Sequence, residues 1–185
     1  MVEVRVLQKF DAAELRRIGP GYTCREKYAV RKNETPERTM LELELVRLEA
    51  PYVKVWSPIS EEEELMYARA VKQGVSRAAF DGREMVAIAV AERMDWNGSL
   101  WVWDFHVIKQ RQRQGIGRKL MTALEDAARG TGLRVITCET QNTNVGAVRF
   151  YRAVGFELEG VDLSYYTNDD AAEGEVALFM KKKLR

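Results

Sequence analysis

The sequence predicts a mixed α/β fold in which a central, mostly antiparallel sheet is flanked by helices. Segments that alternate apolar and polar residues, typical of strands, are followed by segments with a helical period of about 3.6 residues. Two turn signals, Asp81-Gly82 and Asn97-Gly98, separate consecutive strand segments and indicate hairpins. The chain has 185 residues and no internal repeat, so we expect residues 1–185 to form a single domain.

A strand and a helix are expected at the start of the chain. Residues 2–7 alternate apolar and charged side chains. Asp11 is a suitable N-cap for a short helix that ends near Ile18, before a Gly-Pro-Gly turn. Residues 22–58 carry little that is diagnostic, although the alternation in LELELVRL, residues 41–48, favours a strand.

A capped helix and a set of strands follow. Ser60 and Glu63 form a capping box and predict a helix that runs to about residue 73. Three antiparallel strands are then predicted at residues 77–80, 85–93 and 100–107.

The remainder of the chain alternates helices with strands. From Gly115 the period becomes helical, and one face of this helix carries Ile116, Leu120, Leu124 and Ala127. Further along we expect a strand, a helix and two closing strands, at residues 133–140, 144–154, 156–163 and 176–184.

The composition argues against several classes of protein. The net charge of +1 provides no overall field that would favour nucleic acid or a membrane surface. No apolar run reaches transmembrane length, and the first residues have a strand pattern rather than that of a signal peptide, so a cytoplasmic location is expected. One histidine and two widely spaced cysteines do not make a structural zinc site, and no metal is expected.

The most informative segment is VIKQRQRQGIGRK, residues 107–119, in which Gly115 and Gly117 join a strand to a helix. Backbone N–H groups at a helix N-terminus lack internal partners and favour a phosphate, and glycine lets such a ligand approach closely. The segment therefore predicts a pyrophosphate site, with positive charge supplied by Arg113, Arg118 and Lys119.

Two other phosphate-binding motifs do not fit this segment. A Walker loop requires Ser or Thr after a Gly-Lys pair, whereas this chain has Gly117-Arg118-Lys119. A dinucleotide-binding fingerprint requires a third glycine at the position of Leu120. Taken alone, the segment remains compatible with a tight turn that carries solvated basic side chains.

A second constellation lies on the helix predicted at residues 144–154. At 3.6 residues per turn, roughly, Asn144, Ala147 and Tyr151 fall on one face. Such a face is suited to lining a narrow channel, with an amide at one end and a phenol at the other. A tyrosine at this position is also compatible with core packing.

The two segments together resemble the signature of the GNAT superfamily of acyltransferases. The first is Gln-x-x-Gly-x-Gly, residues 112–117, followed by a helix. The second is Asn-x-x-Ala-x-x-x-Tyr, residues 144–151, followed by Gly155-Phe156. The similarity covers roughly residues 60–185. It implies a GNAT fold and direct transfer of an acetyl group from acetyl-CoA to an amine.

The resemblance also implies roles for individual residues. The segment from Gln112 to Arg118 would wrap the pyrophosphate of acetyl-CoA, and the Val107–Ile108 backbone would receive the pantetheine and the acetyl carbonyl. Asn144 would touch the pantetheine arm, and Tyr151 would face the thioester sulfur. The full set expected to bind acetyl-CoA is Val107, Ile108, Gln112, Arg113, Gln114, Gly115, Ile116, Gly117, Arg118, Asn144, Ala147 and Tyr151.

A narrower resemblance is to the streptothricin acetyltransferase branch, which acetylates an amine in the β-lysine portion of an antibiotic. It rests on ETQNTN at residues 139–144, GVDLSYY at residues 160–166 and Asp95-Trp96-Asn97. A protein N-terminus or lysine, or a polyamine, remains open as an alternative acceptor. The non-enzymatic alternative is a sensor that binds acyl-CoA without turnover.

Direct transfer requires a base for the ammonium acceptor and an acid for the departing thiolate. Asp104 and Glu139 are the candidate bases, although each is also compatible with a buried, hydrogen-bonded carboxylate. We assign His106, on the same strand face as Asp104, a structural role. Tyr151 is the candidate acid, and a backbone N–H near Val107, in an irregular strand, would meet the oxyanion.

The expected partner is a small-molecule amine, and the resemblance is compatible with a homodimer. Acceptor-binding candidates are the carboxylate of Asp162 and the aromatic side chains of Trp96 and Tyr165. Asp169, Asp170 and Tyr166 are further candidates in the same C-terminal region. A solvated loop and ordinary aromatic packing are the alternatives for these residues.

Overall fold

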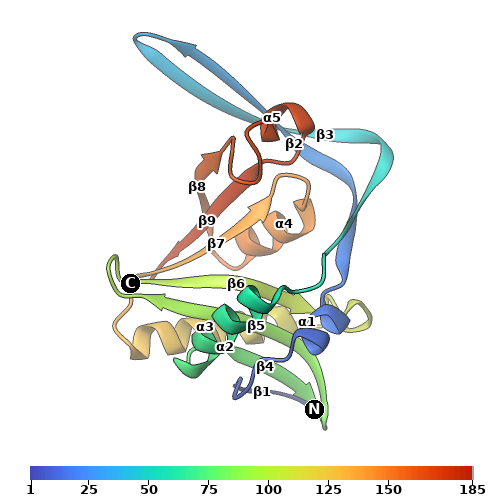
Figure 1. Cartoon of the computed structure of the whole chain (residues 1–185), viewed down its shortest axis with the longest axis vertical. Coiled ribbons are helices and arrows are strands. Elements are labelled where there is room, and N and C mark those ends of the chain that lie inside the picture. The colour runs from blue at the N-terminus through green and yellow to red at the C-terminus, as the bar shows by residue number, and fades with distance from the viewer. Residues whose placement is uncertain (185) are drawn as a thin grey trace. The chain divides into compact units, whose positions relative to one another are not determined.

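The computed structural model describes residues 1–184, and for Glu173 the backbone alone. The chain divides into two compact units, one made of residues 1–20, 55–138 and the C-terminal residues from Lys182, the other of residues 21–54 and 139–181. The strands are β1 Val2–Val6, β2 Gly21–Thr35, β3 Arg38–Val55, β4 Arg77–Asp81, β5 Glu84–Met94, β6 Ser99–Val107, β7 Val135–Gln141, β8 Glu157–Asp162 and β9 Ala177–Lys183 (Figure 1). The helices are α1 Ala12–Ile18, α2 Glu61–Lys72, the 3₁₀ turn η1 Lys109–Arg111, α3 Ile116–Gly130, α4 Val145–Ala153 and α5 Asp170–Glu173.

The sheet of the first unit has the strand order β1-β4-β5-β6-β7. The first four strands are antiparallel to their neighbours, and β6 pairs in parallel with the first half of β7. Both predicted hairpin turns are present, because Gly82 and Gly98 adopt the left-handed conformation with φ of +62° and +64°. The predicted mixed, mostly antiparallel sheet flanked by helices is therefore confirmed.

Local signals define the helices of this unit as the sequence predicts. Asp11 caps α1 by accepting a hydrogen bond of 3.0 Å from the Glu14 N–H. Ser60 and Glu63 form the expected reciprocal capping box at α2. In α3 the last buried residue of the apolar face is Ala128 rather than the predicted Ala127, because at 3.6 residues per turn, roughly, the stripe drifts by one position.

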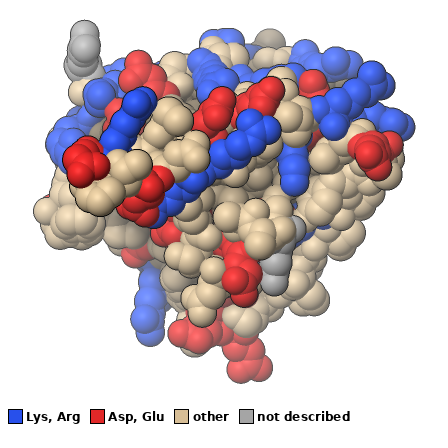
Figure 2. Space-filling model, turned by 90° about the horizontal axis from the view of Figure 1, so that it is seen from above, with Lys and Arg blue, Asp and Glu red and all other residues tan. Residues whose placement is uncertain are grey.

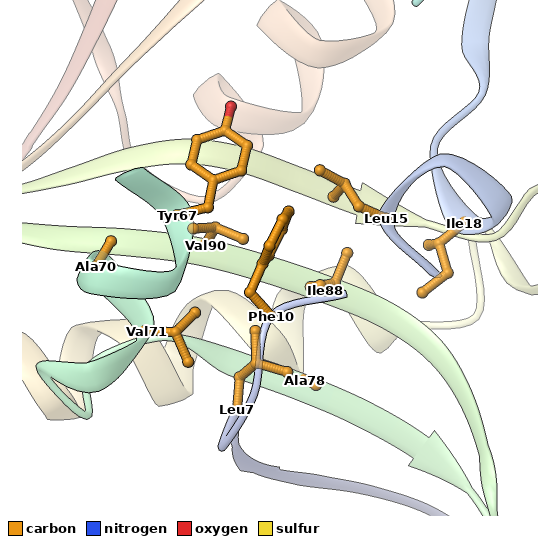
Figure 3. Packing of buried hydrophobic residues seen from close by; sticks show 10 residues of the cluster. All are labelled: Leu7, Phe10, Leu15, Ile18, Tyr67, Ala70, Val71, Ala78, Ile88 and Val90. Atoms are coloured by element: carbon orange, nitrogen blue, oxygen red, sulfur yellow. The ribbon is translucent and has the colours of Figure 1, made fainter. Parts of the chain in front are cut away.

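One hydrophobic core of the first unit lies between α1, α2 and the sheet (Figure 3). Its residues include Leu15 and Tyr67 from the helices and Ile88 and Val90 from β5. Residues 86–91 of β5 are all buried although successive side chains point to opposite faces, so both faces of the sheet are covered. The other face packs against α3, which contacts β1, β4, β5 and β6.

The second unit contains the segment that the sequence left undefined. Residues 21–55 form two long paired strands, β2 and β3, which Figure 1 shows as an extended ribbon. The alternation at residues 41–48 is therefore a strand, as predicted, but it is part of a much longer one. Strands β8 and β9 pair antiparallel, and β9 lies between β8 and β7.

A buried asparagine ties the second unit together. Asn142, at 2% exposure, donates from Nδ2 to the Tyr28 carbonyl at 2.8 Å and accepts from the Val176 N–H at 2.8 Å. Its backbone N–H and C=O bond to the same two residues. A buried residue whose side chain and backbone together satisfy four backbone groups of distant segments fixes their register, because leaving any of these groups unpaired is costly.

The charges on the surface are mixed, in agreement with the net charge of +1. On the face shown in Figure 2, Lys and Arg side chains are interspersed with Asp and Glu. Among residues 1–184, no helix combines the length and the apolar character needed to cross a bilayer.

Candidate functional site

The glycine-containing loop at the start of α3 has an unusual backbone. Arg113 has φ +59°, and among the described residues it is the one non-glycine residue with positive φ. Gly115 follows with φ +82° and is the N-cap of α3. A turn that includes left-handed residues can direct successive N–H groups to one side, and such a concavity binds anions. Strain at a residue such as Arg113 tends to occur where function requires it.

The N-terminus of α3 has no side-chain cap. The first internal bond runs from the Lys119 N–H to the Gly115 carbonyl at 3.0 Å, so the N–H groups of Ile116, Gly117 and Arg118 precede the helical ladder. The first turn contains no acidic residue that would complement the helix dipole. A Cβ built on Gly115 meets nothing within 4 Å, so the space beside Gly115 is open.

Side chains within the loop hold its shape. Gln112 donates from Nε2 to the Val107 carbonyl at 3.0 Å, and Gln114 donates to the Gln110 carbonyl at 3.0 Å. Arg111 binds the carboxylate of Asp81 at 2.5 Å, which anchors the loop to β4. Because both glutamine amides are used in this way, the loop presents mainly backbone N–H groups and basic side chains.

The Val107–Ile108 backbone is only partly available to a ligand. Ile108 donates its N–H to the Val86 carbonyl at 2.9 Å and accepts from the Arg111 N–H at 2.9 Å. The predicted ligand contact therefore cannot involve the Ile108 N–H. In an antiparallel ladder, hydrogen-bonded pairs alternate with pairs that are not hydrogen-bonded. Because Ile108 bonds to Val86, the neighbouring pair of Val107 and Ala87 is of the second kind, and the Val107 N–H points away from β5.

Asp104 and His106 form a bonded pair on β6. His106 Nε2 lies 2.8 Å from Asp104 Oδ1, and the Tyr67 hydroxyl also bonds to Asp104. Gly19 packs so closely on the imidazole that an added Cβ would lie 2.3 Å from it. The sequence predicts an irregular strand near Val107. The irregularity in β6 is a β-bulge at Trp103, four residues before Val107. These partners support the orienting or structural interpretation of Asp104.

Glu139 has a different environment. Burial raises the pKa of this carboxyl to about 7. The hydrogen bond from the Tyr166 hydroxyl and the charge of Lys54 lower the pKa, and the charge of Glu175 raises it. A carboxyl with a pKa near neutrality is half ionised at pH 7, and it is well suited to accept a proton.

A polar cluster around Glu175, which sequence reasoning missed, lies in the same unit. Its carboxylate accepts from the Tyr52 hydroxyl at 2.9 Å and pairs with Lys54 Nζ at 2.5 Å. Tyr22 and Thr143, 2.7 Å apart, each lie 3.4 Å from the same carboxylate oxygen. The cluster joins β2 and β3 to residues that directly precede α4 and β9. No local pattern marks these residues, because they are far apart in the sequence.

The helix predicted at residues 144–154 is present as α4. Asn144 is the N-cap, and its Oδ1 accepts from the Ala147 N–H at 3.2 Å. Because Oδ1 serves the helix, the Nδ2 group is the remaining hydrogen-bonding group of this amide. Tyr151 is 6% exposed, with ring centroids 5.6 Å from Phe150 and 5.2 Å from Phe156.

The residues predicted to bind the acceptor have mixed placements. Asp162 accepts from the Ser164 N–H at 3.0 Å and stabilises a turn, while Tyr165 is 44% exposed and packs edge-on against Phe179. Asp170, a further candidate for holding the acceptor, is 2% exposed and accepts from the backbone N–H groups of Tyr166 and Thr167.

Trp96 is 84% exposed in the β5–β6 turn. It precedes β6, whereas the loop at residues 112–118 follows the other end of that nine-residue strand. At about 3.3 Å per residue, the strand separates the two by more than 20 Å, roughly. Trp96 therefore lies far from this loop, and its predicted role in walling an acceptor pocket stays a prediction.

The described residues contain no group of three or more His, Cys, Asp or Glu side chains arranged to hold a metal ion.

Comparison with known proteins gives consistent results. Residues 41–156 match the model of the acetyltransferase (GNAT) family. Streptothricin acetyltransferase of Streptomyces lavendulae is 35% identical over 97 residues, which are 52% of this chain and 51% of that protein. The chain therefore matches about half of the length of this relative.

Two solved structures resemble the whole chain. A nourseothricin acetyltransferase superimposes with a TM-score of 0.78 at 25% identity, covering 100% of this chain and 99% of the other. A Bacillus anthracis protein assigned as a streptothricin acetyltransferase, solved with acetyl coenzyme A, has a TM-score of 0.76 at 22% identity and the same coverage. At this identity, the second structure supports the fold alone.

Proposed function

The chain belongs to the acetyltransferase (GNAT) family, and on this premise we propose that it transfers the acetyl group of acetyl-CoA directly to a primary amine of a small molecule. The observation that carries the proposal is the uncapped N-terminus of α3, preceded by left-handed Arg113 and Gly115. This segment lies within the residues that match the family.

The loop fits the diphosphate of coenzyme A. Three N–H groups precede the helical ladder, the space at Gly115 is open, and the first turn carries Arg118 and Lys119 but no acid. Gln112 and Gln114 hold the loop, and Arg113 adds positive charge. On α4, the proposal assigns Asn144 and Ala147 to the pantetheine arm and Tyr151 to the sulfur.

When bound, acetyl-CoA supplies a thioester whose C–S bond breaks as the amine nitrogen forms the new C–N bond. Glu139 accepts the proton of the incoming ammonium group, directly or through water, and its pKa of about 7 supports this role over that of the fully partnered Asp104. Tyr151 donates a proton to the departing thiolate. The N–H of Val107, which points away from β5, stabilises the negative charge on the carbonyl oxygen.

The acceptor we propose is a streptothricin-like antibiotic with a β-lysine amine. The name of the Streptomyces lavendulae relative and the similarity at residues 139–144 support this assignment. Asp162, Trp96 and Tyr165 are the proposed acceptor-binding residues. Three further expectations stay predictions: a homodimer, a cytoplasmic location and a single domain over residues 1–185. The last of these residues, Arg185, lies outside the described residues.

An acceptor screen tests the proposed reaction. Release of free thiol from acetyl-CoA would be measured with streptothricin, a polyamine, free lysine and a peptide amine. We expect rapid turnover with streptothricin and much slower turnover with the other amines. Turnover with the peptide alone would replace the acceptor, and binding of acetyl-CoA without thiol release from any amine would favour the sensor alternative.

A matched pair of glycine variants tests the cofactor loop. Gly115 and Gly132 lie just outside opposite ends of α3, both have positive φ, and an added Cβ meets nothing within 4 Å of either. Alanine at either position should therefore cost about 1–2 kcal/mol of stability from backbone strain. Only Gly115→Ala should also weaken coenzyme A binding, by about tenfold, because it disturbs hydrogen bonds to a charged diphosphate.

Calorimetric titration with coenzyme A measures this effect, and urea denaturation measures the shared loss of stability. Equal affinities of the two variants for coenzyme A would place the diphosphate away from the N-terminus of α3.

A further inference from the structure

A tyrosine outside the predicted catalytic set bonds directly to the proposed base. The Tyr166 hydroxyl donates to Glu139 Oε1, and Gln141 Nε2 donates to the Tyr166 oxygen at 3.1 Å. Gln141 and Glu139 lie two residues apart on β7, so their side chains are on the same face of the strand. The phenol is therefore held from two sides.

The loop that carries Tyr166 is fastened by a buried carboxylate. Asp170, at 2% exposure, accepts from the Tyr166 N–H at 2.8 Å and from the N–H and hydroxyl of Thr167 at 2.6 and 2.8 Å. Burial raises the pKa of Asp170, but these hydrogen bonds outweigh burial and hold the pKa below its ordinary value. The carboxylate is thus ionised at neutral pH and fixes the backbone of Tyr166.

We propose that Tyr166 is a positioning residue that holds the Glu139 carboxylate in place for proton transfer, and that Asp170 fastens the loop that presents it. The proposal rests on the proposed function of Glu139 as the base. A half-buried carboxylate can rotate away from its substrate, and a phenol bonded to one oxygen leaves the other oxygen available to the acceptor. Tyr165, the adjacent residue, packs against Tyr166 with ring centroids 5.2 Å apart.

Tyr166 remains a donor throughout the working range of pH. Burial raises its pKa, and the neighbouring charge of Glu139 raises it further. The other charged or titratable groups that act on Glu139 are Glu175 and Lys54, and Tyr165 is in turn influenced by Glu139. Tyr166 bonds directly to Glu139, and loss of this bond removes stabilisation of the ionised form of Glu139.

The test is Tyr166→Phe, which deletes the hydroxyl and keeps the ring. A missing donor raises the pKa of Glu139, so less of the base is ionised at pH 7. We expect kcat to fall about five- to tenfold at pH 7 and to recover toward wild type near pH 9, roughly, with the KM for acetyl-CoA unchanged. A merely structural role would lower activity equally at every pH.

Carbon-13 NMR titration of the Glu carboxyl groups provides a readout that does not depend on turnover. The Glu139 signal is assigned by its absence in Glu139→Gln. In Tyr166→Phe this signal should titrate at higher pH than in the wild type, and an unchanged titration would overturn the inference.

Tyr28→Phe is the matched control. It removes a hydroxyl that accepts from Arg152 at 3.1 Å in the same unit, and it should leave both the titration and the pH profile unaltered. Full activity of Glu139→Gln would refute the proposed base independently of the result for Tyr166.

Discussion

Replacement of Glu139 by Gln should lower kcat/KM by about 10²–10⁴-fold, the usual contribution of a positioned general base. The substitution preserves shape and the hydrogen bond from Tyr166, because the amide oxygen still accepts, but it removes the proton-accepting carboxylate. Because the side chain is partly buried and its ionised form is disfavoured, we expect little loss of stability.

The pH profile gives this prediction a second readout. Glu139 is active when ionised, so activity of the wild type should rise as pH increases through about 7 and be lost as pH falls below it. In Glu139→Gln this limb should vanish, leaving only the slope that arises from deprotonation of the amine. Glu157→Gln, the same change at an exposed position of β8, is the control. A wild-type profile in the Glu139 variant would remove this residue from the mechanism.

Tyr151→Phe should also lower turnover by about 10²–10⁴-fold, because the variant lacks the proposed proton donor to the thiolate. The ring packs beside Phe150 and Phe156, and phenylalanine retains this packing, so we expect the fold to persist. The affinity for acetyl-CoA should change little. A phenol of pKa about 10 protonates a thiolate effectively only when the two are close, so the contribution is one of position.

Turnover and affinity must be measured separately to test this role. Single-turnover rates report the chemical step, and calorimetry reports binding of acetyl-CoA. Tyr28→Phe, a buried tyrosine on β2, controls for loss of a buried hydroxyl. Weakened binding with an unchanged chemical step would make Tyr151 a binding residue instead of an acid.

Local sequence predicted the elements that local interactions form. Asp11, Ser60 and Glu63 satisfy helix ends within three residues of themselves, and Gly82 and Gly98 adopt the left-handed conformation that their hairpin turns require. These interactions span few residues, so their signals are visible in the sequence. The loop before α3 belongs to the same class, and for this reason its glycine-containing turn and the helix that follows could be predicted from the sequence.

The features that the sequence did not predict depend on contacts between residues far apart in the chain. Glu175 meets Tyr52 and Lys54 across more than a hundred residues, and Asn142 bonds to Tyr28 at a similar separation. No periodicity encodes such pairs. Apart from the alternation at residues 41–48, the two long strands at residues 21–55 were likewise hidden, because their mostly exposed faces lack the apolar pattern that marks a buried strand.

The choice between the two candidate bases shows what the sequence determines and what only the tertiary structure decides. Sequence alone identified Asp104 and Glu139 as carboxylates near the ends of neighbouring strands, and it had no means to rank them. Folding pairs Asp104 with His106 and Tyr67, while it partly buries Glu139, bonds it to the Tyr166 hydroxyl and raises the pKa of Glu139 to about 7. Residue type sets what a side chain is able to do, but burial and neighbouring charges set its protonation state, and these arise only when distant segments pack together.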